Sequence, residues 1–203
     1  MREVVITGNR HASAADLVFL SDLQRGQSLL TIPLRRVTSN LLRHPWIKQV
    51  WISRRLPHTL AIRVEEREET VWMADPSGEG CLTIAEGGVI VSEACERAAS
   101  LIELRGARVS GGIGGTLLDR PIVHMIEALR GDGLASLAVR WIDVTDPESV
   151  VLGAATGLRI LLGGLREAPS RLGALAVLQR SLHLEDYEVV DLRFGGEATL
   201  VPR

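Results

Sequence analysis

The feature that most restricts the fold of this chain is a pair of alternating apolar segments joined by a short turn, HPWIKQVWISRRLPHTLAIRVEER at residues 44–67. A period of two residues predicts a β-hairpin with one face buried and the other in solvent. A second layer must therefore cover the apolar face. The residues expected to face that layer are Val50, Ile52, Leu60, Ile62 and Val64.

The residues before this hairpin supply the second layer. A short strand ends at the turn Gly8-Asn9, and Ser13 stands where an N-cap should precede a first helix. A second helix follows Pro33, and Pro45 stops it. The order strand, helix, helix, strand, strand predicts a small two-layer α+β domain over residues 1–67.

Residues 68–203 have a different pattern, with many short apolar runs separated by glycine-containing turns. They predict a mixed, strand-rich domain with flanking helices. The fold class of the whole chain is therefore α+β, with two domains. Strands are expected near residues 70–74, 81–91, 101–104, 137–144, 150–152, 158–162 and 187–201, and helices near 118–130 and 169–182.

The charge also divides the chain after Arg67. The net charge of −2 combines eleven Lys/Arg and five Asp/Glu in residues 1–67 with twelve and twenty in the remainder, which gives +6 and −8. The positive charge of the first domain suggests nucleic acid as a possible partner. However, Trp46 and Trp51 are the only aromatics available to stack bases on the basic hairpin, and no RNA-binding motif is present, so no nucleic-acid partner is predicted.

The sequence offers little support for catalysis or for a cofactor. The five histidines are scattered, and the glycine-rich segment 108–119 lacks the Gly-Lys-Ser/Thr ending of a phosphate loop, which favours a flexible connection into a helix. The glutamates at 65, 66, 68 and 69 are expected to form a solvated, partly ion-paired strand end. We predict no catalytic, cofactor-binding or metal-binding residue. The alternative is a hydrolase with an unrecognised site, which turnover of a substrate by the purified chain would support.

Two cysteines, Cys81 and Cys95, are fourteen positions apart and lack the spacing of a metal site. We expect two small, buried, half-apolar side chains. The alternative is a single disulfide, which requires an oxidising compartment.

Several motifs together resemble one known family. They are VVITGN at 4–9, Pro45-Trp46-Ile47, Arg54-Arg55-Leu56-Pro57, Glu65-Glu66-Arg67 and Val190-Asp191-Leu192-Arg193. In this order and at these separations they resemble the extracytoplasmic part of the FtsQ/DivIB bacterial cell-division proteins, over nearly the whole chain. The resemblance implies a POTRA domain at 1–67 and an FtsQ/DivIB-like β domain at 68–203.

The same resemblance implies a location and partners. Members of the family carry a cytoplasmic tail and one membrane helix before the POTRA domain, so we expect the extracytoplasmic face of the bacterial cell membrane, periplasmic in a Gram-negative. No run within residues 1–203 approaches the roughly eighteen apolar residues of a membrane helix. The implied function is a non-enzymatic divisome scaffold in septum formation that binds FtsB/DivIC-like and FtsL-like proteins. The alternative is a POTRA-bearing periplasmic module of an outer-membrane barrel system.

The resemblance also implies where the partner binds. The last strand would accept a strand of the FtsB/DivIC-like partner through unpaired backbone groups at a sheet edge. An ordinary closing hairpin fits the same residues, and Val201-Pro202 stands where the family pattern has an aromatic. The expected partner-binding residues are Phe194, in the preceding strand, and Ala198, Thr199, Leu200, Val201 and Pro202; Trp51, Arg54 and Arg55 form a possible docking surface on the POTRA domain.

Overall fold

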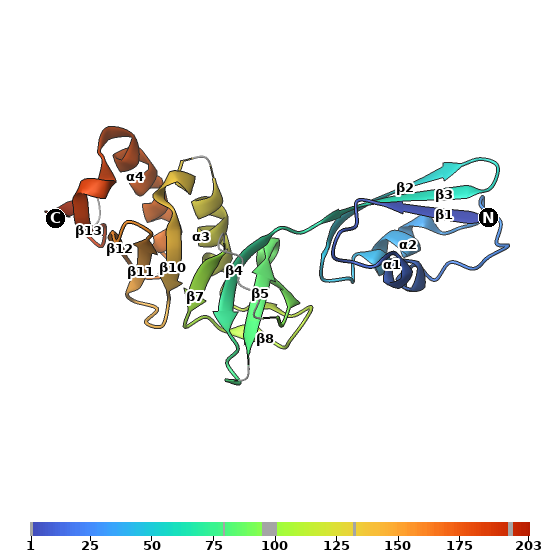
Figure 1. Ribbon diagram of the computed structural model, residues 1–203, viewed down its shortest axis with the longest axis horizontal. Coiled ribbons are helices and arrows are strands. Elements are labelled where there is room, and N and C mark those ends of the chain that lie inside the picture. Colours follow the sequence, from blue (N-terminus) through green and yellow to red (C-terminus); the bar gives the residue numbers. More distant parts are fainter. Residues whose placement is uncertain (1, 79, 95–100, 132, 195–196) are drawn as a thin grey trace. The chain divides into compact units, whose positions relative to one another are not determined.

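A computed structural model describes residues 2–78, 80–94, 101–131, 133–194 and 197–203. The chain forms two compact units, unit 1 (Met1–Glu68) and unit 2 (Glu69–Arg203). Both contain helices packed against strands, so the predicted α+β class is confirmed (Figure 1). Cys95, one of the two cysteines singled out in the sequence, lies outside the described residues.

Unit 1 has the predicted order of elements: β1 (Glu3–Thr7), α1 (Ala14–Ser21), α2 (Leu34–Leu41), β2 (Ile47–Arg55) and β3 (Thr59–Glu66). The strand order is β1-β3-β2, with β3 parallel to β1 and antiparallel to β2. Ser13 caps α1 as expected, because its hydroxyl accepts the N–H of Asp16 at 3.0 Å. Helices α1 and α2 lie on one face of the sheet (Figure 1).

The core of unit 1 lies between the helices and that face of the sheet. Leu60, Ile62 and Val64 are buried, and the two predicted apolar residues of β2 pack against them. A register shift between Ile47 and Gln49 places Ile47 in the core as well, because a bulge reverses the side-chain alternation. The predicted burial of the hairpin is therefore confirmed.

Two of the motifs that carry the family resemblance in unit 1 meet where β3 ends. The ring of His11 stacks on Trp46 with their centroids 4.0 Å apart, and the backbone N–H of Arg67 donates to the Trp46 carbonyl oxygen at 2.7 Å. These contacts hold the β1–α1 loop, the start of β2 and the end of β3 together. The motifs at 44–47 and 65–67 thus have a structural role.

The carboxylate of Glu66 ties the same loop to β3. Its side chain is 6% exposed, and its oxygens accept the backbone N–H groups of Arg10, His11 and Ala12 at 2.9 to 3.1 Å. Burial opposes ionisation, but the three backbone hydrogen bonds outweigh burial and lower the pKa of this carboxyl group. The expected solvated strand end is therefore wrong at Glu66, whereas Glu65 forms an ion pair with Lys48 at 3.4 Å.

Glu66→Gln is expected to lower the free energy of unfolding of unit 1 by about 1–3 kcal/mol at neutral pH, because an amide donor then faces backbone donors. The folded pKa lies below the usual value of 4.5, so the carboxylate stabilises the fold above that value. This contribution is lost as the pH falls through the folded pKa. Urea unfolding, followed through the NMR amide signals of residues 2–66, should show the wild type and the variant converging in acid. A constant difference would contradict this role.

Unit 2 contains one extended sheet, in which eleven strands of the described residues follow the order β14-β13-β12-β11-β10-β7-β4-β5-β6-β9-β8. Parallel and antiparallel pairs are mixed. The helices α3 (Arg120–Arg130) and α4 (Ala168–Ser181) pack against each other and contribute to one large apolar core. The strands are β4 (Glu69–Ala74), β5 (Cys81–Ala85), β6 (Val89–Ser92), β7 (Ile102–Arg105), β8 (Val109–Ser110), β9 (Thr116–Leu117), β10 (Val139–Asp143), β11 (Val150–Ala154), β12 (Arg159–Gly163), β13 (Tyr187–Asp191) and β14 (Thr199–Pro202), and the 3-10 turns are Glu86–Gly88, Ala135–Leu137 and Leu184–Asp186.

Two expectations for unit 2 change. The glycine-rich segment at 108–119 is a small antiparallel hairpin of β8 and β9 at one sheet edge rather than a flexible connection. Cys81 is buried in β5 as predicted, but its sulfur is disulfide-bonded. The expectation of an unpaired thiol is therefore wrong for Cys81.

Candidate partner-binding edge

Strand β14 forms one edge of the sheet in unit 2. It pairs antiparallel with β13, with Val201 opposite Val189 and Leu200 opposite Val190. No other strand of the described residues pairs with β14. One side of β14 therefore has the unpaired backbone groups that strand addition requires.

The two faces of β14 have different surroundings. Leu200 in β14 and Ala198, which directly precedes the strand, are half-buried and pack against the core of unit 2, where Val190 on β13 is fully buried. Thr199 and Val201 point to the opposite face, and Val201 is 43% exposed. A strand added at this edge would have one face beside Leu200, where its apolar side chains could extend the core. Its other face would lie beside the exposed side chain of Val201.

Phe194 lies beyond the end of β13, so its expected place within the preceding strand is wrong. Its side chain is 64% exposed, and the Arg193 guanidinium carbon lies 5.6 Å from the ring centroid. The aromatic ring of Phe194 is therefore accessible to a partner beside the β13–β14 hairpin, but the residue does not belong to a strand of the sheet.

A bidentate ion pair fixes the chain where it leaves β13. Arg193 Nη2 donates to Asp191 Oδ2 at 2.7 Å, and Arg193 Nε lies 3.0 and 3.1 Å from the two carboxylate oxygens. The side-chain hydrogen bonds from Arg193 lower the pKa of the buried Asp191 carboxyl group. Asp191 also pairs with Thr199 in the backbone ladder, so the ion pair lies beside the last residue pair of the β13–β14 hairpin. It gives the Asp-Leu-Arg motif a structural role.

The residues of the expected POTRA surface have different roles. Trp51 is exposed on the sheet face away from the helices, with the Arg63 guanidinium 5.4 Å from its ring centroid. Arg54 holds backbone instead: its Nε donates to the Leu29 carbonyl oxygen at 2.7 Å and its Nη2 to that of Ile32 at 2.8 Å. Arg55 is exposed at the end of β2. Arg54 therefore positions the α1–α2 loop, and Trp51 and Arg55 are accessible.

A separate apolar depression lies between α2 and β2, at the sheet edge formed by β2. It has a volume of about 390 Å³. It therefore lies beside an edge strand of unit 1. The residues that line it are Leu34, Arg35, Thr38, Ser39, Leu42 and Ile52.

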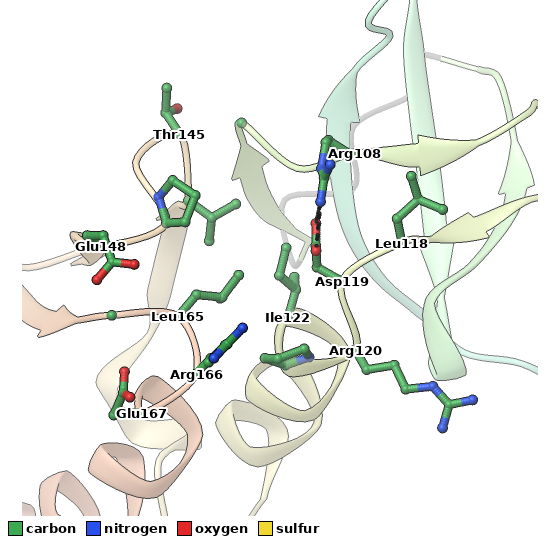
Figure 2. A pocket seen from close by; sticks show the side chains of 15 residues that line it. Arg108, Leu118, Asp119, Arg120, Ile122, Thr145, Glu148, Leu165, Arg166 and Glu167 are labelled. Carbon is green, nitrogen blue, oxygen red and sulfur yellow. Dashed lines mark hydrogen bonds and ion pairs between the residues drawn. The ribbon is translucent and has the colours of Figure 1, made fainter.

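Unit 2 contains an open cleft of about 990 Å³ at the first residues of α3 and the segment before α4 (Figure 2). Three separate chain segments line it, at 106–122, 144–148 and 164–167. Because no single segment carries a recognisable motif, this cleft could not be predicted from the sequence. A Cβ at Gly106, which has φ +77°, would overlap the backbone of Thr145, so the close approach of two lining segments requires glycine there.

The charges in the cleft are mixed. Arg108 and Asp119 form an ion pair at 3.0 Å, and the dashed line in Figure 2 marks it. Arg120 and Arg166 share the cleft with Glu148 and Glu167. No group of three or more His, Cys, Asp or Glu residues within the described ranges is arranged to hold a metal ion.

The fold and the matched family define the class of protein. Residues 1–67 match the family model described as "POTRA domain, FtsQ-type". The chain is thus a protein in which an FtsQ-type POTRA domain precedes a mixed, strand-rich unit. Its relatives include the cell division protein FtsQ of Rickettsia bellii, which is 32% identical over 73 residues, or 36% of this chain and 27% of the relative.

Two further relatives extend the comparison. The cell division protein DivIB of Geobacillus kaustophilus is 33% identical over 72 residues, which cover 36% of this chain and 28% of the relative. That of Clostridium acetobutylicum is 27% identical over 117 residues, or 57% of this chain and 46% of the relative. The predicted resemblance to FtsQ/DivIB cell-division proteins is confirmed for 36–57% of the chain, which includes the FtsQ-type POTRA domain, and not for nearly the whole chain. The matched segment spans about a quarter of the length of the first two relatives and about half of the third.

None of the helices within the described ranges is long and apolar enough to cross a membrane.

Proposed function

We propose that the chain is the extracytoplasmic part of a non-enzymatic scaffold of the bacterial division machinery. The support is its relation to proteins named for cell division, through an FtsQ-type POTRA domain. That type also favours division over the alternative of an outer-membrane barrel module. In this proposal the chain acts outside the cell membrane, and a single membrane helix preceding β1 in the full-length protein anchors it.

We propose further that β14 accepts a strand from an FtsB/DivIC-like protein, which acts together with an FtsL-like protein. The observation that carries this proposal is the edge position of β14, with β13 on one side and no described strand on the other. Backbone hydrogen bonds would supply affinity, and alternate side chains of β14 would supply specificity. Pro202 has no N–H, so donors to an added strand come from the residues before it.

The expected site residues other than Arg54 have a part in this proposal. Ala198 and Leu200 support the strand from the core side, whereas Thr199 and Val201 contact the added strand on the exposed face. Phe194 is an aromatic contact beside the hairpin and takes the place of an aromatic at the end of β14. Trp51 and Arg55 of the POTRA domain are proposed to contact other division proteins.

Amide hydrogen exchange of the full chain tests the location. On addition of the extracytoplasmic region of the cognate FtsB/DivIC-like protein, the amides of β14 should become protected, because strand addition pairs the free side of this edge. Calorimetry on the same mixture confirms binding. Protection confined to β2 and α2, with β14 unchanged, would place the partner on unit 1 and overturn the proposal.

A further inference from the structure

One end of unit 1 brings together three segments that are distant in sequence. Arg54 at the end of β2 holds the carbonyl oxygens of Leu29 and Ile32 in the α1–α2 loop. The backbone N–H of Arg2 donates to the carbonyl oxygen of His58 in the β2–β3 turn at 2.9 Å. The chain therefore enters β1 at the same end that carries this turn (Figure 1).

Two large apolar side chains project from this end. Leu30 in the α1–α2 loop is 74% exposed and Leu56 in the β2–β3 turn is 71% exposed. The loop itself is anchored, because Leu29 and Ile32 on either side of Leu30 are buried in the core. Since the loop already has its own apolar anchors, folding of unit 1 does not explain Leu30.

The surroundings of these leucines are basic. From Leu23 to Val64 the sequence contains no Asp or Glu. Arg55 lies next to Leu56 at the end of β2, and Arg2 lies at the start of β1. The acidic residues at this end are Glu3, whose carboxylate accepts the Thr59 hydroxyl at 3.1 Å, and Asp22 at the start of the α1–α2 loop, which forms an ion pair with Arg36 at 3.0 Å. The basic residues of the α1–α2 loop, the first turn of α2 and the end of β2 are Arg25, Arg35, Arg36, Arg54 and Arg55.

We propose that this end of unit 1, formed by Leu30, Leu56, Arg2 and Arg55 and here named the basic end, binds the surface of an anionic lipid bilayer. The leucines enter the headgroup region, and the guanidinium groups contact lipid phosphates. The charge of the basic end is complementary to such a surface. Two isolated leucines on a turn and a loop bury far less area than the roughly 800 Å² per partner of a stable protein interface.

This inference goes beyond the proposed scaffold and does not depend on the binding of a partner at β14. It agrees with the proposed membrane anchor, because a membrane helix that precedes β1 would be connected to unit 1 at the basic end. Contact of the basic end with the bilayer would restrict the orientation of unit 1 next to the membrane. Partner capture and lipid binding are separate measurements, so either can fail without the other.

Co-sedimentation of the full chain with vesicles tests the proposal. The wild type should bind vesicles that contain phosphatidylcholine and phosphatidylglycerol, and should bind phosphatidylcholine alone much more weakly. Raising the salt concentration should release it. The double variant Leu30→Glu/Leu56→Glu should bind at least about tenfold more weakly, because it removes both apolar contacts and adds two negative charges. Arg55→Glu should weaken binding by about fivefold or more.

Matched variants in unit 2 separate the basic end from general charge effects. Ile113→Glu replaces another exposed apolar residue, and Arg180→Glu reverses an exposed arginine on α4; both should bind like the wild type. NMR amide signals establish that each variant is folded.

Three results would overturn the proposal. They are equal binding to both vesicle types, an absence of binding by the wild type, and equal losses in the basic-end and control variants. Self-association that the double leucine variant abolishes would identify a second copy as the occupant and overturn the lipid assignment.

Discussion

Val201→Glu should weaken binding of the FtsB/DivIC-like partner by about tenfold or more while the chain stays folded. Val201 lies on the exposed face of β14, so the substitution places a charge beside the added strand without opening the core. Calorimetric titration of the full chain with the extracytoplasmic region of the cognate partner measures this change.

The control is another exposed valine of the same unit. Val177 on α4 is 62% exposed, and Val177→Glu should leave the affinity unchanged. Leu200→Glu does not serve this purpose: Leu200 packs against the core, so this variant should lose stability together with binding. Equal affinities of the Val201 and Val177 variants would rule out the outer face of β14 as a contact surface.

Gly8→Ala should lower the free energy of unfolding of unit 1 by about 3 kcal/mol or more. Gly8 follows β1 and has φ +91°, where a residue with a side chain is already strained. In addition, a Cβ at this position would overlap the carbonyl oxygen of Val64 on the central strand β3. Because a small domain has only a few kcal/mol of net stability, this loss should unfold much of unit 1.

Gly26→Ala provides the matched control. Gly26 has φ +86°, but no atom of the described residues lies within 4 Å of an added Cβ. Its substitution should carry only the backbone strain of about 1–2 kcal/mol. Urea unfolding followed through the NMR amide signals of residues 2–66 compares the two variants. Equal losses would show that the overlap with Val64 is relieved at no cost.

The local pattern of unit 1 was predictable because each element follows from short-range chemistry. Alternation in the hairpin, the cap at Ser13 and the prolines at 33 and 45 specify strands and helices within a few residues. A strand at the end of the chain was also expected from its pattern. These features depend on neighbours in sequence, which the sequence shows directly.

The functional meaning of individual side chains was not predictable in the same way. Arg54 and Arg55 are adjacent and chemically identical, yet Arg54 holds two loop carbonyls and Arg55 faces solvent. Glu65 and Glu66 differ similarly, since Glu66 alone receives three backbone N–H groups. In each case the partner lies more than twenty residues away, so burial and hydrogen bonding are decided by tertiary packing.

The same distinction applies to the candidate site. The alternation predicted a last strand over residues 197–201, with Leu200 and Val201 on opposite faces; the structure has this strand at Thr199–Pro202. Only the tertiary structure decided that Leu200 faces the core, that β14 ends the sheet, and that Leu30 and Leu56 project from one basic end. The physical reason is that alternation fixes relative direction along a strand, whereas the identity of the buried face depends on what packs against it.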